Sequence, residues 1–293
     1  MTAPDLVTLG SGDLVVELLP ALGGRLHRIR AFGHDLLRTP PHPRIHASEG
    51  FFWGAYPMAP WCNRARAGSH RVAGRRVDLA ANFPDGSAIH GLVSDVPWQI
   101  AGLGRLSVEV DDPAWPWPFG VALNATVGSA AVTLGYRLTN RADAPMPAGL
   151  GLHPWFVAPL EVAIPARAAY RANTDSPADP EPVAGGLDLS TRARPTRDLD
   201  ATWTGLRRPE VVIAWPGLGI EATLTAATAA GALNVALASP ADLGAVAVEP
   251  QTHGPDPLRR LAHGEPDAPV LLAPGADLAL DLRLEVRLAR NVR

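Results

Sequence analysis

The chain has 293 residues, 47% of them hydrophobic and 19% charged, and a formal net charge of -3, so it can bury a large core but lacks the basic surface typical of nucleic-acid-binding proteins. All 26 side chains counted as lysine or arginine are arginine, which excludes a lysine Schiff base and an ordinary P-loop. The length permits one large domain or two ordinary ones.

Short apolar runs separated by turn residues dominate the chain. Thirty prolines and 28 glycines leave few windows for an uninterrupted amphipathic helix. The last predicted strand alternates aliphatic with charged side chains at period two, as expected for a strand with one buried face. In chain order, the predicted strands are Leu14–Leu19, Val96–Ile100, Leu106–Val110, Val121–Val127, Ala131–Leu138, Val211–Trp215, Ile220–Thr225, Leu233–Ala238, Ala245–Val248 and Asp277–Leu288.

Turn residues join several of these runs into predicted hairpins, at Ala73-Gly74, Gly128-Ser129 and Pro216–Gly219. Many short strands with such punctuation predict an all-β fold, a large antiparallel β-sandwich, and we assign residues 1–293 to a single domain. The stretch Asn173–Arg197 is rich in Pro, Asp, Gly and Arg and is expected to be a surface excursion. A helical turn or two inside loops, for instance around Trp203, would be compatible with this assignment.

The cysteine content and the N-terminal residues bear on location. Cys62 is the only cysteine, so neither an intramolecular disulfide nor a cysteine zinc cluster can form. The N-terminal residues lack a secretory pattern, and no apolar run of about 18 residues follows. These features predict a soluble, cytoplasmic protein with no membrane partner.

Polar side chains of catalytic types occur in several short motifs. In Tyr56–Arg64 two prolines fix an extended loop in which aromatic rings and a guanidinium follow each other, a combination that suits sugar hydroxyls. His90 precedes a glycine that would allow close approach of a ligand or another backbone segment. Taken alone, Arg64 also fits a surface loop and His90 a structural histidine, and Cys62 fits a small buried hydrophobe better than a nucleophile.

Two further motifs end apolar runs. His153 is followed by a proline, which should end regular strand pairing there, and by two aromatic residues. Glu249 likewise stands before a proline at the end of an apolar run. An imidazole and a carboxylate at such junctions can act as general acid and base on an uncharged substrate.

Nine histidines make a metal site worth considering, with His42 and His46 four residues apart. That pair lies in a proline-rich stretch that cannot form a helix with both rings on one face. We therefore predict no metal.

The order of these motifs resembles that of the aldose 1-epimerase (galactose mutarotase) family. The matching residues are Asn63-Arg64, His90-Gly91, His153-Pro154-Trp155-Phe156, Asp200 and Glu249-Pro250, with Ala21–Leu26 similar to the first hairpin of that family. The resemblance spans nearly the whole chain. It implies a galactose mutarotase-like supersandwich that opens and recloses a hexose ring without a cofactor.

The resemblance also implies the role of each site residue. Glu249 would be the general base and His153 the general acid, while Arg64, His90 and Asp200 would hold sugar hydroxyls. Asn63 and Trp155 complete the predicted substrate-binding set. The expected partner is a small-molecule sugar, bound by a monomer or homodimer.

Three alternatives stay open at this point. Arg71, Arg75 and Arg76 could bind the phosphate of a hexose 6-phosphate, although a solvent-facing hairpin edge explains them equally well. A non-catalytic sugar-binding protein could share the fold. A glycosidase would need a pair of carboxylates, for which Asp200 and Glu249 are the candidates.

Overall fold

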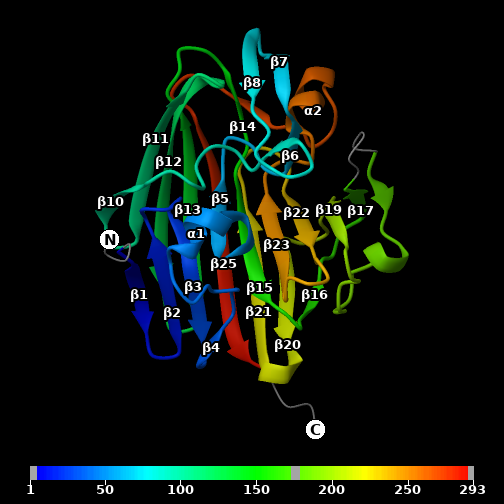
Figure 1. The fold of residues 1–293 in the computed structure, drawn as a ribbon. Helices are drawn as coiled ribbons and strands as arrows, with labels where there is room; N and C mark the ends of the chain where they lie inside the picture. Colours follow the sequence, from blue (N-terminus) through cyan, green and yellow to red (C-terminus); the bar gives the residue numbers. More distant parts are fainter. Residues whose placement is uncertain (1–4, 173–178, 290–293) are drawn as a thin grey trace.

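The computed structural model describes residues 5–172 and 179–289. Two large antiparallel sheets pack against each other and form most of the molecule (Figure 1). In the first, of 11 strands, the order is β1-β2-β3-β5-β15-β23-β22-β19-β17-β18, with β4 beside β3. Its strands are β1 (Val7–Ser11), β2 (Leu14–Leu19), β3 (Arg25–Ala31), β4 (His34–Asp35), β5 (Ala55–Met58), β15 (Gly151–Val157), β17 (Ala168–Arg171), β18 (Glu181–Pro182), β19 (Asp200–Thr204), β22 (Asn234–Ala238) and β23 (Ala245–Gln251).

The second sheet has eight strands in the order β10-β11-β12-β13-β25-β21-β20-β16. They are β10 (Gln99–Gly102), β11 (Arg105–Asp112), β12 (Trp115–Val127), β13 (Ala131–Asn140), β16 (Glu161–Ala163), β20 (Glu210–Trp215), β21 (Ile220–Ala227) and β25 (Asp277–Leu288). These two sheets confirm the predicted all-β antiparallel sandwich.

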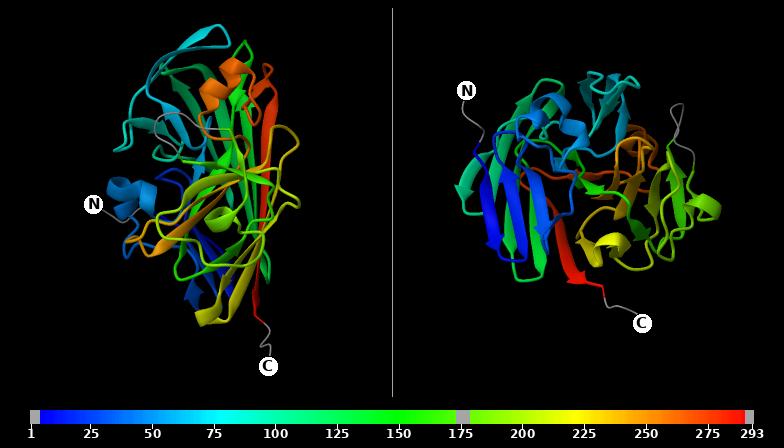
Figure 2. Two further views of the ribbon diagram at one scale, coloured as in Figure 1. Left: turned by 90° about the vertical axis from the view of Figure 1, so that its right-hand side faces the viewer. Right: turned by 60° about the horizontal axis from the view of Figure 1, so that its bottom comes forward.

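Small elements decorate this framework. The two-stranded pairs are β6 (Arg64–Arg66) with β9 (Ser87–Ile89), β7 (Gly68–Val72) with β8 (Arg75–Leu79), and β14 (Met146–Ala148) with β24 (Val270–Leu272). The α-helices are α1 (Ile45–Glu49) and α2 (Pro257–His263), and the 3-10 turns are η1 (Gly50–Phe52), η2 (Gly185–Leu187) and η3 (Pro216–Leu218). None of the helices in the described ranges is long and apolar enough to cross a membrane. Figure 2 (left) places α1 on the side of the first sheet that faces away from the second.

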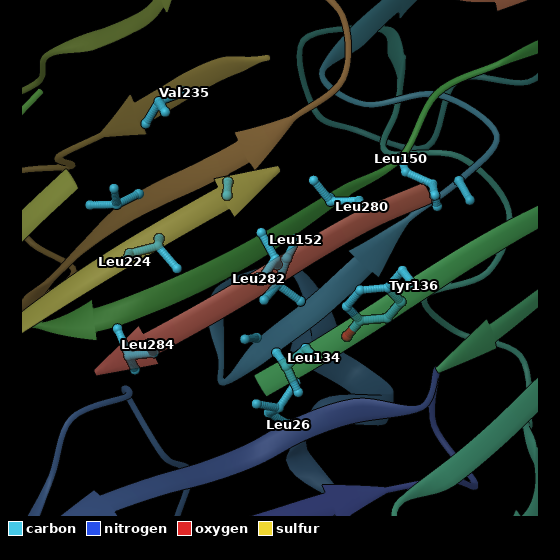
Figure 3. Packing of buried hydrophobic residues seen from close by; sticks show 14 of the residues in the cluster. Leu26, Leu134, Tyr136, Leu150, Leu152, Leu224, Val235, Leu280, Leu282 and Leu284 are labelled. Carbon is cyan, nitrogen blue, oxygen red and sulfur yellow. The ribbon is translucent and has the colours of Figure 1, made fainter. Parts of the chain in front are cut away.

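The main core lies between the two sheets. Alternate side chains of β15, such as Leu152, pack there against Leu282 and Leu284 of β25 and Leu134 of β13 (Figure 3). Because side chains alternate along a strand, the intervening residues of β15 project to the outer face of the first sheet. There they meet a second, smaller apolar cluster that includes Trp155.

Most strand predictions are confirmed. The runs predicted at Leu14–Leu19 and Asp277–Leu288 have the same bounds as β2 and β25, and all three predicted turns close hairpins. The run at Val96–Ile100 is wrong in its first part, since β10 begins at Gln99. Val96 and Trp98 instead make backbone hydrogen bonds to the loop that follows β2.

The prediction that Pro154 ends regular strand pairing is wrong, and β23 is longer than the strand predicted at Ala245–Val248. β15 continues through Pro154 to Val157, and β23 continues through Pro250 to Gln251. The paired residues of β15 and β23 resume at Trp155 after three residues without assigned partners. A proline therefore removes individual hydrogen bonds here without ending the strand, because the neighbouring strands on both sides hold the chain extended.

Trp203, which was allowed as the place of a helical turn in a loop, instead lies in β19 between β17 and β22. The indole is buried and donates a hydrogen bond of 2.9 Å to the Leu187 carbonyl. Of the predicted excursion at Asn173–Arg197, residues 173–178 lie outside the described residues. The rest is mostly exposed and includes β18 and η2.

Candidate active site

A row of side chains crosses five neighbouring strands of the first sheet. Tyr56 of β5 pairs with His153 of β15, and the register between β15 and β23 sets His153 opposite Glu249. Glu249 pairs with Ala236 of β22, which pairs with Thr202 of β19. Residues directly opposite each other in antiparallel strands project to the same face of the sheet. The fold therefore places the imidazole beside the carboxylate on the outer face.

His153 and Glu249 are in direct contact. Nε2 of His153 lies 3.1 Å from Oε1 of Glu249, and each side chain is only 5% exposed. The Tyr56 ring stacks on the imidazole, with ring centroids 4.6 Å apart. Nδ1 of His153 and Oε2 of Glu249 are buried without a hydrogen-bond partner in the described part of the chain. The pair is thus held in place, and each residue keeps one atom that could form a hydrogen bond with a ligand.

Burial governs the protonation of this pair. It raises the pKa of Glu249 to about 8, with the charge of Asp200 adding to the rise and Arg64 opposing it. Burial also lowers the pKa of His153 to about 3, and Arg64 acts in the same direction. Both shifts favour the uncharged forms. A carboxylic acid beside a neutral imidazole holds as many protons as a carboxylate beside an imidazolium, so one proton transfer interconverts the two states.

Arg64 brings a guanidinium to the site between two carboxylates. Its Nη1 donates to Oδ2 of Asp200 at 3.2 Å, and its Nε donates to Oδ2 of Asp85 at 2.7 Å. Asp85 also accepts hydrogen bonds from the backbone N–H and the hydroxyl of Ser87. Burial raises the pKa of Asp200, an effect that Arg64 opposes. The remaining guanidinium donors are available for hydroxyl groups.

His90 and Asn63 occupy unusual backbone conformations beside the pair. Their φ angles are 64° and 57°, in the left-handed region that side chains other than glycine rarely adopt. The backbone N–H of Asn63 donates to Nδ1 of His90 at 3.2 Å, so the neutral ring carries its proton on Nε2. Burial, with His153 and Arg64, lowers the pKa of His90 well below its usual value. His90 is therefore a neutral hydrogen-bond donor.

The glycine after His90 permits close approach of backbone, as predicted. A Cβ at Gly91 would lie 1.9 Å from the Ala59 carbonyl oxygen. Gly91 also has a φ of 77°. Another backbone segment, rather than a ligand, is what approaches there.

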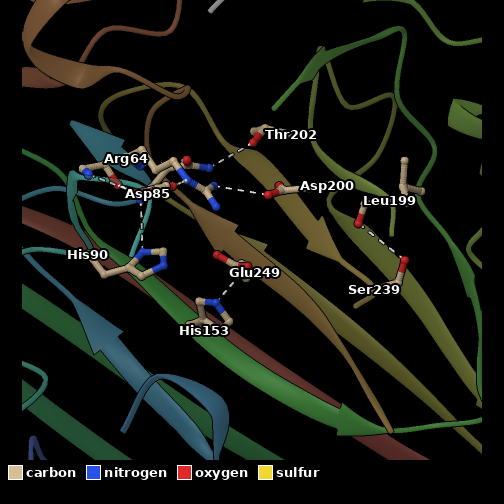
Figure 4. Close-up of polar contacts among 11 residues, drawn as sticks. Arg64, Asp85, His90, His153, Leu199, Asp200, Thr202, Ser239 and Glu249 are labelled. Atoms are coloured by element: carbon tan, nitrogen blue, oxygen red, sulfur yellow. Dashed lines mark hydrogen bonds and ion pairs between the residues drawn. The ribbon is translucent and has the colours of Figure 1, made fainter. Parts of the chain in front are cut away.

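A pocket lies over the row, lined by both polar and aromatic side chains, as is typical of small-molecule sites. Figure 4 shows the polar side chains converging on one space from separate strands and loops. The polar lining residues are Asn63, Arg64, His90, His153, Asp200 and Glu249, and the aromatic ones are Phe51, Phe52, Tyr56, Phe83 and Trp155.

All seven residues that the sequence pointed to line this one pocket, although their roles stay predictions. The sequence reasoning missed Asp85, Phe51 and Phe83. Asp85 lies in a turn-forming stretch, where its carboxylate serves both the turn and Arg64. Tyr56 was noted as an aromatic residue, but its stacking on His153 depends on strand pairing.

Other candidate groups lie elsewhere or are inert. Cys62 is fully buried, and burial together with Glu249 raises the pKa of its thiol well above the usual value, which suits a structural thiol. Arg75 and Arg76 form ion pairs with Asp143 and Asp78, both at 2.7 Å. These two arginines are absent from the pocket lining.

His90, His153 and Glu249 each offer a ligand atom, and these atoms lie within 4.8 Å of one another. This trio could hold a divalent cation, but such an ion would occupy atoms through which His153 and Glu249 contact each other. Two histidines, His42 and His46, were considered as metal ligands from the sequence. Nε2 of His46 forms a hydrogen bond of 3.0 Å with Nδ1 of His27. The Nδ1 of His42 accepts a backbone N–H at 3.1 Å.

The aldose 1-epimerase family model matches residues 5–216, which is most of the chain. The chain belongs to the aldose 1-epimerase family. The matched span includes Arg64, His90, His153 and Asp200, whereas Glu249 lies beyond it. No curated protein matches the sequence significantly.

Solved structures share the fold of this aldose 1-epimerase family member. An Escherichia coli K12 protein provisionally assigned as an aldose 1-epimerase has a TM-score of 0.83 at 19% identity, covering 97% of this chain and 99% of its own. A galactose mutarotase-like protein from Clostridium acetobutylicum has a TM-score of 0.82 at 14% identity, covering 96% and 94%. An aldose epimerase homologue from C. elegans has a TM-score of 0.81 at 17% identity, covering 98% and 100%. These likenesses establish the galactose mutarotase-like fold.

Proposed function

We propose that this protein is an aldose 1-epimerase that interconverts the α and β anomers of a hexose by acid–base ring opening and reclosure. The observation that carries the proposal is the contact of 3.1 Å between Nε2 of His153 and Oε1 of Glu249 at the base of a pocket. The two oxygens that must exchange protons in an aldose are bonded to the same carbon. Two neighbouring groups, one for each oxygen, therefore match this chemistry.

Ring opening removes a proton from the C1 hydroxyl and adds a proton to the ring oxygen, and reclosure reverses both transfers. Glu249 as carboxylate accepts the proton of the C1 hydroxyl while His153 as imidazolium gives a proton to the ring oxygen. The C1–ring oxygen bond then breaks and C1 becomes an aldehyde. Rotation about the C1–C2 bond presents the other face of the aldehyde. The two proton transfers reverse on closure, so each group returns to its starting state.

The pKa shifts bear on where the proton rests. Burial favours protonated Glu249 and neutral His153, which is the state that the pair holds after ring opening. The carboxylate–imidazolium state holds the same number of protons and precedes ring opening. Each turnover thus passes through both states of the pair, and neither requires a proton from solvent.

The rest of the lining supplies recognition. Arg64 and Asp200 present donors and acceptors, and His90 presents its Nε2–H, all suited to sugar hydroxyls. Aromatic rings such as Trp155 offer flat apolar walls for the carbon–hydrogen faces of a sugar ring.

Specific observations weigh against the alternatives. A phosphate clamp built from the β7–β8 hairpin finds no support, because Arg75 and Arg76 pair with aspartates and do not line the pocket. In a glycosidase Asp200 would have to act on the substrate, yet it is engaged by Arg64. The expectations of a single domain, a cytoplasmic location and a monomer or homodimer stay predictions.

The test is anomer exchange of free hexoses, followed by two-dimensional exchange NMR. Glu249→Gln keeps the size of the side chain but cannot accept a proton, so the catalysed rate should fall by about 10²-fold or more with binding retained. His153→Asn should fall similarly, and the double variant should be little worse than either. Chelation should leave the wild-type rate unchanged. Near-normal exchange by a folded Glu249→Gln variant would refute the mechanism.

A further inference from the structure

The short turn η1, which forms one wall of the pocket, is held through its backbone carbonyls. Its first carbonyl accepts a hydrogen bond of 2.7 Å from Nη1 of Arg25. The middle carbonyl accepts one of 2.6 Å from the indole of Trp155, and the last accepts one of 2.7 Å from Nη1 of Arg38. Three successive carbonyls are thus bound by side chains from three separate segments. Neither arginine lines the pocket.

Arg38 also contacts the loop between β22 and β23. Its Nε donates to the Leu243 carbonyl at 3.1 Å, in the loop that follows the pocket-lining residue Pro240. The guanidinium lies 3.3 Å from the centre of the Trp53 ring. One side chain therefore ties η1 to the loop before β23.

The backbone of Arg38 is held independently of this side chain. Its N–H donates to the Trp155 carbonyl at 2.7 Å, and its carbonyl accepts from Gly54 at 2.9 Å. The side chain is only half-buried. Removing the guanidinium should accordingly free the last carbonyl of η1 and loosen that end of the turn, without unfolding the segment that carries residue 38.

The turn held in this way supplies two aromatic rings to the pocket. The Phe51 ring contacts the rings of Phe83 and His90, with centroids 5.8 and 6.3 Å apart. Phe52 packs beside Trp155 and is 37% exposed at the mouth of the pocket. The position of η1 therefore decides the width of the mouth and the location of the wall facing the sugar.

We propose that Arg38 is a positioning residue that fixes this aromatic wall, and that the wall sets the affinity for the sugar rather than the rate of proton transfer. The inference rests on the proposed function. A wall that is ordered in advance spares the complex the entropy of ordering it on binding. The wall contacts substrate and transition state alike, so its loss raises KM and leaves kcat nearly unchanged.

The experiment compares Arg38→Ala and Arg38→Lys with the control Arg137→Ala. Arg137 is an arginine of the second sheet that forms an ion pair of 2.9 Å with Asp281 and does not line the pocket. Arg38→Ala should raise KM for anomer exchange about tenfold, the effect of ordering one or two side chains, with kcat within about twofold of wild type. Lysine keeps the charge, but its single nitrogen cannot reach both carbonyls as the two guanidinium nitrogens do, so the KM of Arg38→Lys should lie between those of wild type and Arg38→Ala. The control should match wild type.

Hydrogen–deuterium exchange provides a readout that needs no substrate. Peptides covering residues 45–54 should exchange faster in Arg38→Ala than in wild type or the control. Unchanged exchange there, or a fall in kcat with unchanged KM, would overturn the role of Arg38. If the wild-type protein did not interconvert anomers, the proposed function would be wrong. Hydrogen–deuterium exchange of residues 45–54 would still test whether Arg38 holds η1.

Discussion

Replacing Glu249 by glutamine should stabilise the folded protein at neutral and alkaline pH while it abolishes proton transfer. Burial raises the pKa of Glu249 from 4.5 to about 8. Above pH 4.5 the unfolded chain therefore releases this proton while the folded protein keeps it. The folded state then binds more protons than the unfolded state, so its stability falls as pH rises.

The size of this effect follows from the pKa shift. Each unit by which the pKa differs between the folded and unfolded states corresponds to about 1.4 kcal/mol. Burial of Glu249 therefore lowers the free energy of unfolding by about 3 kcal/mol at pH 7 and by about 5 kcal/mol above pH 8. That is a large share of the roughly 5–15 kcal/mol by which domains are stable. Glutamine has similar size and does not titrate. The stability difference between the variant and wild type should therefore grow between pH 4.5 and pH 8 and then level off.

Urea unfolding followed by tryptophan fluorescence at a series of pH values measures this difference. Any constant contribution from the changed hydrogen bond to His153 cancels when only the pH dependence is compared. Glu285→Gln is a suitable control, because Glu285 is 58% exposed and pairs with Arg283 at the surface. A difference between Glu249→Gln and wild type that stayed constant from pH 5 to pH 8 would refute the assignment of a buried, protonated Glu249.

Three further predictions concern pH and recognition. First, kcat/KM should fall above pH 8, because the pKa of Glu249 is about 8 and the proposed acid–base pair loses its single shared proton there. A carboxylate of that pKa acting alone as a base would instead make kcat/KM rise as the pH passes about 8. Second, burial lowers the pKa values of His27, His46 and His253 to about 4, 3 and 4, so below pH 6.5 the unfolded chain binds protons that the folded protein does not. Stability should then drop by about 2 kcal/mol per histidine at pH 5; equal urea midpoints at pH 7 and pH 5 in the Glu249→Gln background would contradict this. Third, Arg64→Ala should raise KM and lower kcat together in the NMR assay, and the wild type should favour free hexoses over their 6-phosphates; a hundredfold preference for the phosphates, about 2.7 kcal/mol, would reverse the choice of substrate.

The strands whose bounds could be predicted from the sequence are those with one face toward the core and one toward solvent. β25 alternates buried leucines with exposed charged residues, so its bounds could be found from the sequence. β15 and β23 are almost wholly buried on both faces and contain prolines. They show no alternation, so the strand predicted at Ala245–Val248 stops short of the true end of β23, and regular pairing was wrongly expected to end at Pro154.

The chemical kinds of the site residues were visible in the sequence, because an imidazole, a guanidinium and two carboxylates stand out in otherwise apolar or turn-forming stretches. The resemblance to a family supplied their order and their expected roles. Asp85 and Phe51 could not be found in this way. Their importance comes from what they touch, and both occur in stretches whose local pattern is that of an ordinary turn.

By itself, then, the sequence determined the fold class, the approximate positions of ten of the strands and seven of the residues that line the pocket. Only the tertiary structure decided that His153 and Glu249 touch, since their 3.1 Å contact depends on the register of two central strands far apart in the chain. It also decided their protonation, because neither residue type sets its own pKa. The removal of water by a buried pocket, together with the charges of Arg64 and Asp200, moves both groups toward their uncharged forms.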